Sequence, residues 1–114
     1  MKKRSISIKT KVEIQDLFKK GKLIRMDGFS VFYKYTRLAI SRILVTFPRS
    51  FKGAVNRNRV RRIFKECFRN QLYLFKNSSV DFIFLIFPKK SNVNYHELEM
   101  MMKSLFLKVD KREM

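Results

Sequence analysis

The chain has 114 residues, and its 27 Lys and Arg against 9 Asp and Glu give a formal net charge of +18. This length allows one domain with a modest core, and a content of 46% hydrophobic and 14% aromatic residues excludes a chain that stays disordered through low hydrophobicity. The excess positive charge must therefore lie on a folded surface, where it predicts an anionic partner.

The first predicted elements are a flexible basic N-terminal arm and a short helix. Residues 1–8 are predicted to form the arm. The basic start Met1–Arg4 is not followed by the apolar segment of a signal peptide, so export is not expected. Thr10 and Glu13 form a capping box, so a helix is predicted to begin there. Gly21 is expected to end it in the left-handed conformation. The apolar face of this helix consists of Val12, Ile14, Leu17 and Phe18.

Two β-prone segments follow, Phe29–Tyr35 and Leu38–Phe47, with a turn predicted near residues 36 and 37. Side chains alternate between the two faces of a strand, so Phe32 and Lys34 are predicted to lie on the same face of the first strand. An aromatic ring beside a cation suits a single-stranded nucleic acid, whose bases stack while its phosphates are neutralised.

The clearest pattern is a basic helix after Asn56. Its apolar residues recur at helical spacing and predict a core-facing stripe of Val60, Ile63, Phe64, Cys67 and Phe68. The segment Lys52–Arg69 holds seven basic residues and one acidic residue, Glu66. A merely solvated helix face would intersperse acids to relieve repulsion between like charges. Arginines along one face favour an extended polyanion, since each guanidinium can make two charge-assisted bonds.

A central strand and a last helix complete the predicted order. Val80–Phe87 is apolar on both faces apart from Asp81, which predicts the middle of a sheet. Asn94 is predicted to cap the last helix, with Glu97 at the capping-box position. Its inner face consists of Leu98, Met101, Met102, Leu105 and Val109. The strand, helix and strand over Ile43–Phe47, Val60–Leu74 and Val80–Phe87 predict a crossover between parallel strands.

Groups that could form a self-sufficient active site are scarce. His96 is the only histidine and is predicted to be solvated on a helix, which excludes triads and metal clusters built on several histidines. Cys67 is predicted to be an unreactive core thiol, and its solitary state favours a cytoplasmic setting. The longest apolar run, Phe82–Phe87, is too short to span a membrane, and we expect no membrane association.

The segment from Ala54 to Arg69 resembles the protein component of bacterial ribonuclease P. Arg57-Asn58-Arg59 matches the Arg-Asn-Arg motif of that family, and the basic and apolar residues after it follow the family order. The likeness extends to Leu17–Gly21, Phe29–Phe32 and Asp81–Phe87. It implies a single α+β domain (an α/β sandwich) in α-β-β-β-α-β-α order, with a four-stranded sheet, helices packed on it and a left-handed βαβ crossover.

The resemblance also implies a function. The chain would be the non-catalytic protein subunit of ribonuclease P, assisting a catalytic RNA and its Mg²⁺ in the endonucleolytic removal of the 5′ leader from precursor tRNA. The catalytic centre is expected in the RNA, with no organic cofactor and no obligate protein partner. The implied leader contacts are Phe18, Phe32, Lys34 and Ile14. The implied contacts to the catalytic RNA are Arg57, Asn58, Arg59, Arg61, Arg62, Lys65 and Arg69.

The sequence departs from the family pattern at several positions. Ile14 stands where an aromatic residue is usual, Leu44 replaces a glycine, and Gly53 comes one position late. Asn56, at a usually apolar position, is a candidate N-cap of the basic helix. A small basic ribosomal or other structural RNA-binding protein stays open as an alternative function. A DNA-binding module is a further alternative, although no helix-turn-helix signature is recognisable.

Overall fold

The structure is a computed structural model that describes residues 6–8, 10–36, 41–71 and 79–113. Its elements are β1 (Ile6–Ser7), α1 (Lys11–Lys20), β2 (Lys22–Met26), β3 (Phe29–Thr36), β4 (Arg42–Thr46), α2 (Ala54–Asn70), β5 (Ser79–Ile86), the 3₁₀ helix η2 (Pro88–Lys90) and α3 (Tyr95–Glu113). From α1 onward this is the predicted α-β-β-β-α-β-α order, so the single α+β domain is confirmed. The two-residue β1 adds an edge strand to the four predicted ones.

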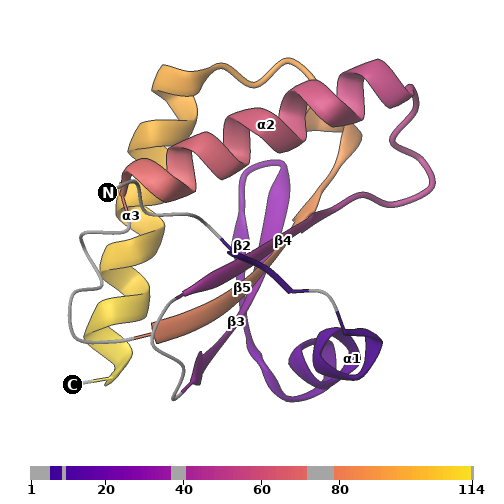
Figure 1. Ribbon diagram of the computed structural model, residues 1–114. Coiled ribbons are helices and arrows are strands. Elements are labelled where there is room, and N and C mark those ends of the chain that lie inside the picture. The colour runs from indigo at the N-terminus through magenta and orange to yellow at the C-terminus, as the bar shows by residue number, and fades with distance from the viewer. Residues whose placement is uncertain (1–5, 9, 37–40, 72–78, 114) are drawn as a thin grey trace.

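The sheet is mixed, with strand order β1-β4-β5-β3-β2. Strand β5 lies in the middle of the sheet, as its apolar sequence predicted. It runs parallel to β4 and antiparallel to β3. Because α2 connects the parallel neighbours β4 and β5, the predicted crossover is present. In Figure 1 the β1 edge faces the viewer, and the chain leaves β4, passes through α2 above the sheet and returns to β5 behind β4. This path makes the crossover left-handed.

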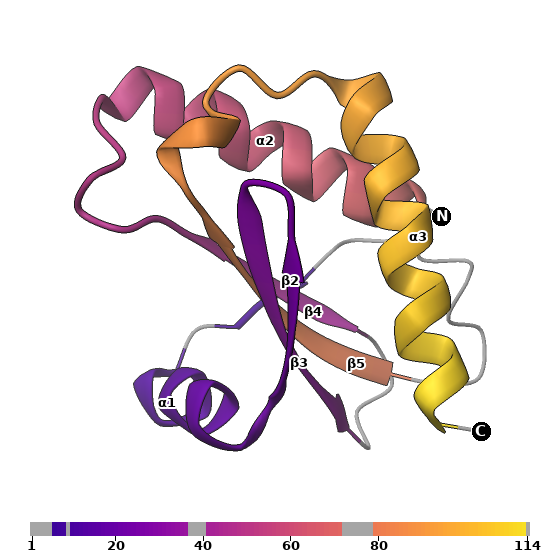
Figure 2. The same ribbon diagram turned by 180° about the vertical axis from the view of Figure 1, so that it is seen from behind.

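The main core fills the face of the sheet that α2 and α3 cover, while α1 lies on the opposite face (Figure 2). It is rich in aromatic side chains: the rings of Phe29 and Phe64 are 5.2 Å apart, and those of Phe68 and Phe82 are 5.4 Å apart. The stripe predicted for α2 is confirmed, with Ile63 half-buried and its other members fully buried. Helix α3 contributes its predicted inner face and also Phe106, which is 1% exposed.

A smaller apolar cluster lies on the other face of the sheet, beneath α1. Its buried members are Ile8, Leu17 and Ile83, and the half-buried side chains packed against them are Ile14, Phe32 and Leu44. Ile8 is 2% exposed, and residues 6 and 7 pair in parallel with β4. The arm predicted over residues 1–8 is therefore wrong for residues 6–8, because Ile8 is apolar and fills the space beside α1. Residues 1–5 of the predicted arm lie outside the described residues.

Both predicted helix caps at Thr10 and Asn94 are confirmed. The Glu13 amide donates to Thr10 Oγ1 at 3.4 Å, and the Glu97 amide donates to Asn94 Oδ1 at 2.8 Å. The left-handed end predicted at Gly21 is wrong: its φ of −70° and ψ of 160° are extended, because β2 begins at the next residue. A glycine is nevertheless needed there, since a Cβ would lie 2.4 Å from the Leu17 carbonyl oxygen.

Other predicted boundaries also change. Helix α2 begins at Ala54 after Gly53, whose φ is +90°, so the Asn56 N-cap is wrong and this residue lies inside the first turn. The strand predicted over Leu38–Phe47 is described only from Ser41 onward, where β4 covers Arg42–Thr46. Thr36, predicted to lie in a turn, still belongs to β3. Helix α2 ends at Asn70, before the predicted Leu74, which lies outside the described residues.

Candidate nucleic-acid interface

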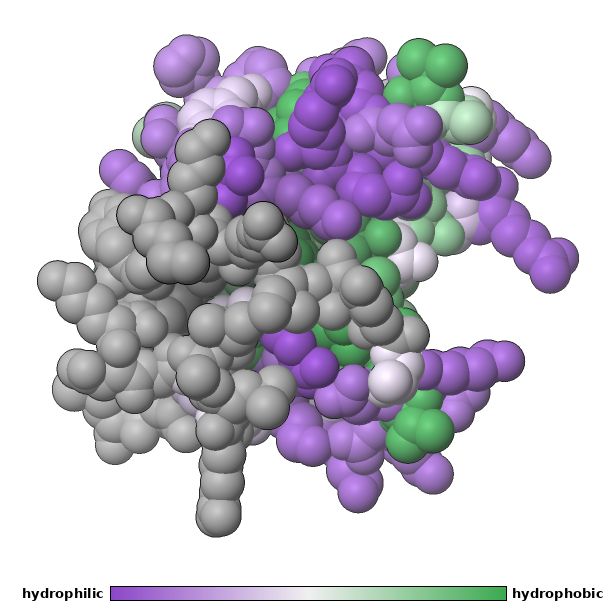
Figure 3. All heavy atoms as spheres, in the orientation of Figure 1, coloured by the Kyte–Doolittle hydropathy of each residue, from purple (hydrophilic) through white to green (hydrophobic). Residues whose placement is uncertain are grey.

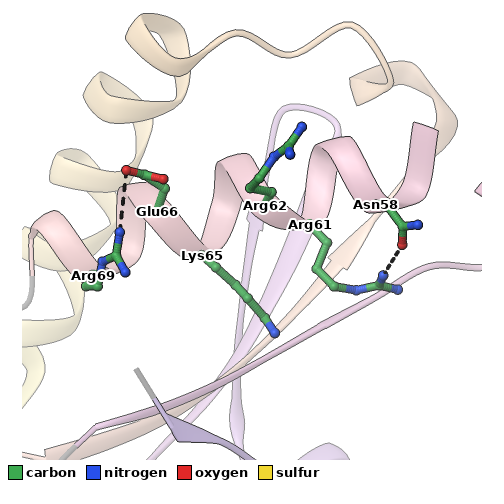
Figure 4. A pocket seen from close by; sticks show the side chains of 6 residues that line it. All are labelled: Asn58, Arg61, Arg62, Lys65, Glu66 and Arg69. Carbon is green, nitrogen blue, oxygen red and sulfur yellow. Dashed lines mark hydrogen bonds and ion pairs between the residues drawn. The ribbon is translucent and has the colours of Figure 1, made fainter. Parts of the chain in front are cut away.

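The outer face of α2 carries a shallow depression lined by basic side chains (Figure 4). We call it the α2 face; its residues are Asn58, Arg61, Arg62, Lys65, Glu66 and Arg69. Glu66 is its single acid and lies 3.4 Å from Arg69. Arg61 donates to Asn58 Oδ1 at 2.9 Å, whereas Arg62 and Lys65 make no hydrogen bond or ion pair with the described part of the chain. Such a cluster of like charges is suited to an anionic ligand.

Two arginines implied as contacts to the catalytic RNA lie away from the α2 face. Arg57 donates from Nε and Nη2 to the Phe51 carbonyl, at 3.0 and 2.7 Å. Arg59 donates to the carbonyls of Ser91 and Val93, the latter at 3.4 Å. Thus five of the seven implied residues line the α2 face, while Arg57 and Arg59 face backbone oxygens of two connecting segments.

The segment between β4 and α2 forms a second basic depression, next to the α2 face. Its residues are Val45, Thr46, Phe47, Pro48, Arg49, Arg57 and Arg61. The Arg61 guanidinium lies over the Phe47 ring, 5.2 Å from its centroid, and Phe47 in turn contacts Phe51 at 4.7 Å between centroids. This cation–π contact fixes the direction of Arg61, which lines both depressions.

The four implied leader contacts lie together on α1 and β3. The rings of Phe18 and Phe32 meet edge to face, with centroids 4.8 Å apart and planes at 69°. Phe18 is 39% exposed, and Ile14 packs with Phe32 in the cluster under α1. Lys34 donates to Asp16 at 2.8 Å. The two rings thus present an accessible aromatic edge beside Lys34, whose positive charge is partly compensated by Asp16.

An ion-pair network fastens α1 to the sheet. Arg42 donates to both carboxylate oxygens of Asp81, at 2.9 and 2.6 Å, and to both of Glu13, at 3.3 and 2.7 Å. The hydrogen bonds that Arg42 donates to Asp81, and then those that it donates to Glu13, raise the pKa of Arg42 above its ordinary value. Conversely, the Arg42 hydrogen bond lowers the pKa of Glu13, with Thr10 as the next cause. Asp81, the single acid of an otherwise apolar strand, was the sequence signal for this network.

Strand β2 extends the aromatic surface, and sequence analysis missed its residues. Leu23 is 40% exposed and pairs with Phe32 across the sheet, while Arg25 pairs with Ser30. The available signal was Asp27-Gly28, a pair that favours tight hairpin turns; Gly28 has a φ of +88°. On the β1 side of the molecule, Figure 3 shows a hollow at the right between α1 below and the α2 side above, with hydrophilic side chains on its rims and hydrophobic atoms on its floor.

Groups suited to acid–base or nucleophilic chemistry are not assembled in the described ranges. His96 is exposed, as predicted, and Cys67 is fully buried. Burial, and to a lesser extent Glu99, raises the pKa of the Cys67 thiol to about 12, so the predicted inert core thiol is supported. Within those ranges no group of three or more His, Cys, Asp or Glu residues could hold a metal ion. No described helix has the length and apolarity required to cross a membrane.

Together, the fold and these surfaces define a small, strongly basic α+β protein with an exposed cationic helix face and a separate aromatic surface. A sequence model of the Ribonuclease P family matches residues 1–110. The chain is 65% identical over 114 residues to the ribonuclease P protein component of Borrelia hermsii, covering 100% of both chains. It is 47% identical over 113 residues to that of Borreliella burgdorferi strain ZS7, covering 97% of this chain and 95% of the relative. The chain therefore belongs to the ribonuclease P protein family, which takes part in tRNA processing.

Solved structures support the same fold. The ribonuclease P protein of Thermotoga maritima matches with a TM-score of 0.76 at 22% identity, over 87% of this chain and 95% of that one. The protein of Staphylococcus aureus matches with a TM-score of 0.76 at 19% identity, over 95% of this chain and 97% of that one. The family suggested by the Arg-Asn-Arg segment and the fold that it implied are confirmed.

Proposed function

We propose that this chain is the protein subunit of ribonuclease P and binds two RNAs through two separate surfaces. The α2 face would bind the catalytic RNA subunit, and the surface around Phe18 and Phe32 would bind the 5′ leader of precursor tRNA. The observation that carries this proposal is the placement of the two surfaces on helices that cover opposite faces of one sheet. One small domain can therefore contact two RNA segments at once.

The charge of the α2 face supports binding to a folded RNA. Arg61, Arg62, Lys65 and Arg69 stand on one side of a single helix, with Glu66 as the only acid. Guanidinium groups bind phosphates with paired hydrogen bonds, and each neutralised phosphate releases condensed counterions. Assembly with the RNA subunit should therefore weaken steeply as salt rises.

The surface on α1 and β3 supports binding to a single strand. A base can stack on the exposed part of Phe18, with Phe32 holding that ring from below at 4.8 Å. Stacking accepts any base, which suits a leader of variable sequence. Lys34 and Arg25 would lie near the phosphates of the same strand, since Lys34 follows Phe32 by two residues on the same face and Arg25 pairs with Ser30.

Catalysis would belong to the RNA. We infer that Mg²⁺ is held by the RNA subunit and the substrate, because the two acids of α1 and Asp81, the neighbour of Lys34 in the sheet, are already paired: Glu13 and Asp81 with Arg42, and Asp16 with Lys34. When bound to the RNA, Mg²⁺ would activate the water that hydrolyses the leader phosphodiester. The protein would supply binding and positioning in the cytoplasm, without an organic cofactor.

The test is reconstitution. Purified protein alone should leave precursor tRNA uncut, and adding the cognate RNA subunit with Mg²⁺ should give faster leader removal than that RNA alone at physiological salt. The proposal is wrong if the protein neither binds nor stimulates that RNA. Sequencing the RNA that copurifies from cells separates the alternative: ribosomal RNA in place of the ribonuclease P RNA would favour a structural RNA-binding protein.

A further inference from the structure

The two arginines that flank Asn58 in the Arg-Asn-Arg motif differ from the other basic residues of α2 in what they contact. The guanidinium of Arg57 makes two hydrogen bonds to the Phe51 carbonyl, and that of Arg59 bonds to the carbonyls of Ser91 and Val93. Neither residue lines the α2 face. A backbone carbonyl is a strong acceptor for a charged donor, so these side chains have defined positions before any RNA arrives.

Arg57 holds the segment between β4 and α2. Phe51, whose carbonyl it binds, is 1% exposed, and its amide donates to Pro48 in a turn at 3.0 Å. The Phe51 ring contacts Phe47 at 4.7 Å, and Phe47 supports the Arg61 guanidinium at 5.2 Å. A continuous chain of contacts therefore runs from Arg57 through the two rings to a cation of the α2 face.

Arg59 holds the connection between β5 and α3. Val93 is 2% exposed, and its amide donates to the Lys90 carbonyl at 3.1 Å. Lys90 is 7% exposed and pairs with Glu97 in the first turn of α3 at 2.8 Å. The carbonyls bound by Arg59 thus belong to a well-packed segment. The hydrogen bonds of Arg59 hold the first half of α2 against this segment.

We propose that Arg57 and Arg59 are positioning residues, which set α2 and Arg61 against two connecting segments, and that the phosphate contacts belong to the α2 face. This inference rests on the proposed function and assigns different roles within it to the basic residues of α2. It revises the implication that every arginine of the motif contacts the RNA. Arg62 is the matched comparison, because it stands on the same helix, is exposed, and has no hydrogen-bond or ion-pair partner in the described residues.

The experiment measures thermal stability and the salt dependence of the dissociation constant for the ribonuclease P RNA in single variants of the full chain. Arg62→Ala should lower the slope of log K against log salt by about 0.7 to 0.9, the value for one phosphate contact, with an unchanged melting temperature. Arg59→Ala and Arg59→Lys should both lower the melting temperature by roughly 5 °C or more with an unchanged slope, because a lysine cannot span two carbonyls. Arg57→Ala and Arg57→Lys should also lower the melting temperature, because a lysine cannot reproduce the two hydrogen bonds of the guanidinium to the Phe51 carbonyl. Since Arg57 also sets Arg61, the slope of these variants should fall by no more than it falls in Arg61→Ala.

The Lys variants keep the positive charge and so separate the two roles. If Arg59→Lys keeps wild-type stability while Arg59→Ala loses as much slope as Arg62→Ala, Arg59 contacts phosphate directly and the inference is overturned. Circular dichroism well below the melting temperature establishes that each variant is folded during the binding measurement. If wild-type protein fails to bind the RNA, the proposed function itself fails, and that result is distinct from either outcome for Arg59.

A double-mutant cycle tests whether Arg57 acts through Arg61. RNA affinity is measured for Arg57→Lys, Arg61→Ala and the double variant, at a temperature where all three are folded. If Arg57 positions Arg61, the double variant should bind no more than about twofold more weakly than Arg61→Ala. A loss equal to the product of the two single losses would show that the residues act independently and would overturn the proposed chain of contacts.

Discussion

Replacing Arg42 by Met is expected to be among the most destabilising changes on the α1 side of the sheet. The Arg42 and Asp81 side chains are 14% and 10% exposed, and Arg42 forms a two-point contact with this carboxylate at 2.9 and 2.6 Å. Arg42→Met fills a similar volume but leaves Asp81 as an unpaired, largely buried charge. The same change also removes the hydrogen bonds from Arg42 to Glu13 of α1.

The expected cost follows from this burial. Breaking a buried pair by removing one partner typically costs about 3 to 5 kcal/mol, and the remaining solvent access of both groups favours the lower end, about 3 kcal/mol. The bond to Glu13 adds little to this figure, since the Glu13 side chain is 42% exposed and solvent screens its attraction to Arg42. An unfolding entropy of about 2.1 cal/mol/K per residue converts 3 kcal/mol into a fall in melting temperature of roughly 12 °C for a chain of 114 residues.

Urea unfolding at neutral pH, followed by circular dichroism, measures the cost, and a double-mutant cycle isolates the pair. Arg42→Met combined with Asp81→Leu removes both charges, so the double variant should be more stable than Arg42→Met alone. A loss below about 1 kcal/mol in the single variant would refute the reasoning from burial. Simple addition of the two single costs would show that the two groups do not depend on each other.

Three further predictions concern the leader surface, the thiol and pH. Phe18→Ala should weaken precursor tRNA binding by the holoenzyme about tenfold while mature tRNA binding is unchanged, since one stacked base contributes about 1 to 3 kcal/mol; equal effects on both RNAs would contradict this. Cys67 should resist iodoacetamide at pH 8 in the native protein and react in urea, because burial raises its pKa to about 12. Ion pairs lower the pKa of Glu13 below 4.5 and that of Asp16 below 3.8 in the folded protein. The two carboxylates therefore stabilise the fold fully above these pH values, and this stabilisation is lost as the pH falls through their lower pKa values in the folded state. Glu13→Gln combined with Asp16→Asn should therefore flatten the acid side of the stability curve.

Patterns with a strong local period could be read from the sequence alone. The stripe on α2 repeats over a long helix, so one face had to meet the core and its basic residues had to remain outside. Strand β5 was equally clear because an apolar run with a single acid has no solvent-facing side. Strand β2 was less evident: its sequence, Lys22–Met26, alternates weakly, and only the Asp27-Gly28 turn pointed to a hairpin.

What the sequence could not show was the destination of individual charged side chains. Arg57 and Arg62 carry the same group on the same helix, yet Arg57 binds a carbonyl six residues away and Arg62 is exposed. Arg59 binds carbonyls that lie 32 and 34 residues further along the chain. Residue type does not reveal which backbone carbonyl of an irregular segment accepts such a hydrogen bond, because every residue has a carbonyl. Helical periodicity gives the side of the helix but not which charges are already satisfied.

The described ion pairs also explain how the charge of +18 is distributed. Six of the seven pairs lie outside α2, where Asp16, Asp27, Glu13, Asp81 and Glu97 meet basic partners. On α2 the single pair is Arg69 with Glu66. Acids therefore neutralise much of the positive charge beside Phe18 and Phe32. Most of the positive charge of the α2 face has no acidic partner among the described residues. If both surfaces bind RNA as proposed, counterion release dominates at α2, and base stacking dominates at the aromatic pair.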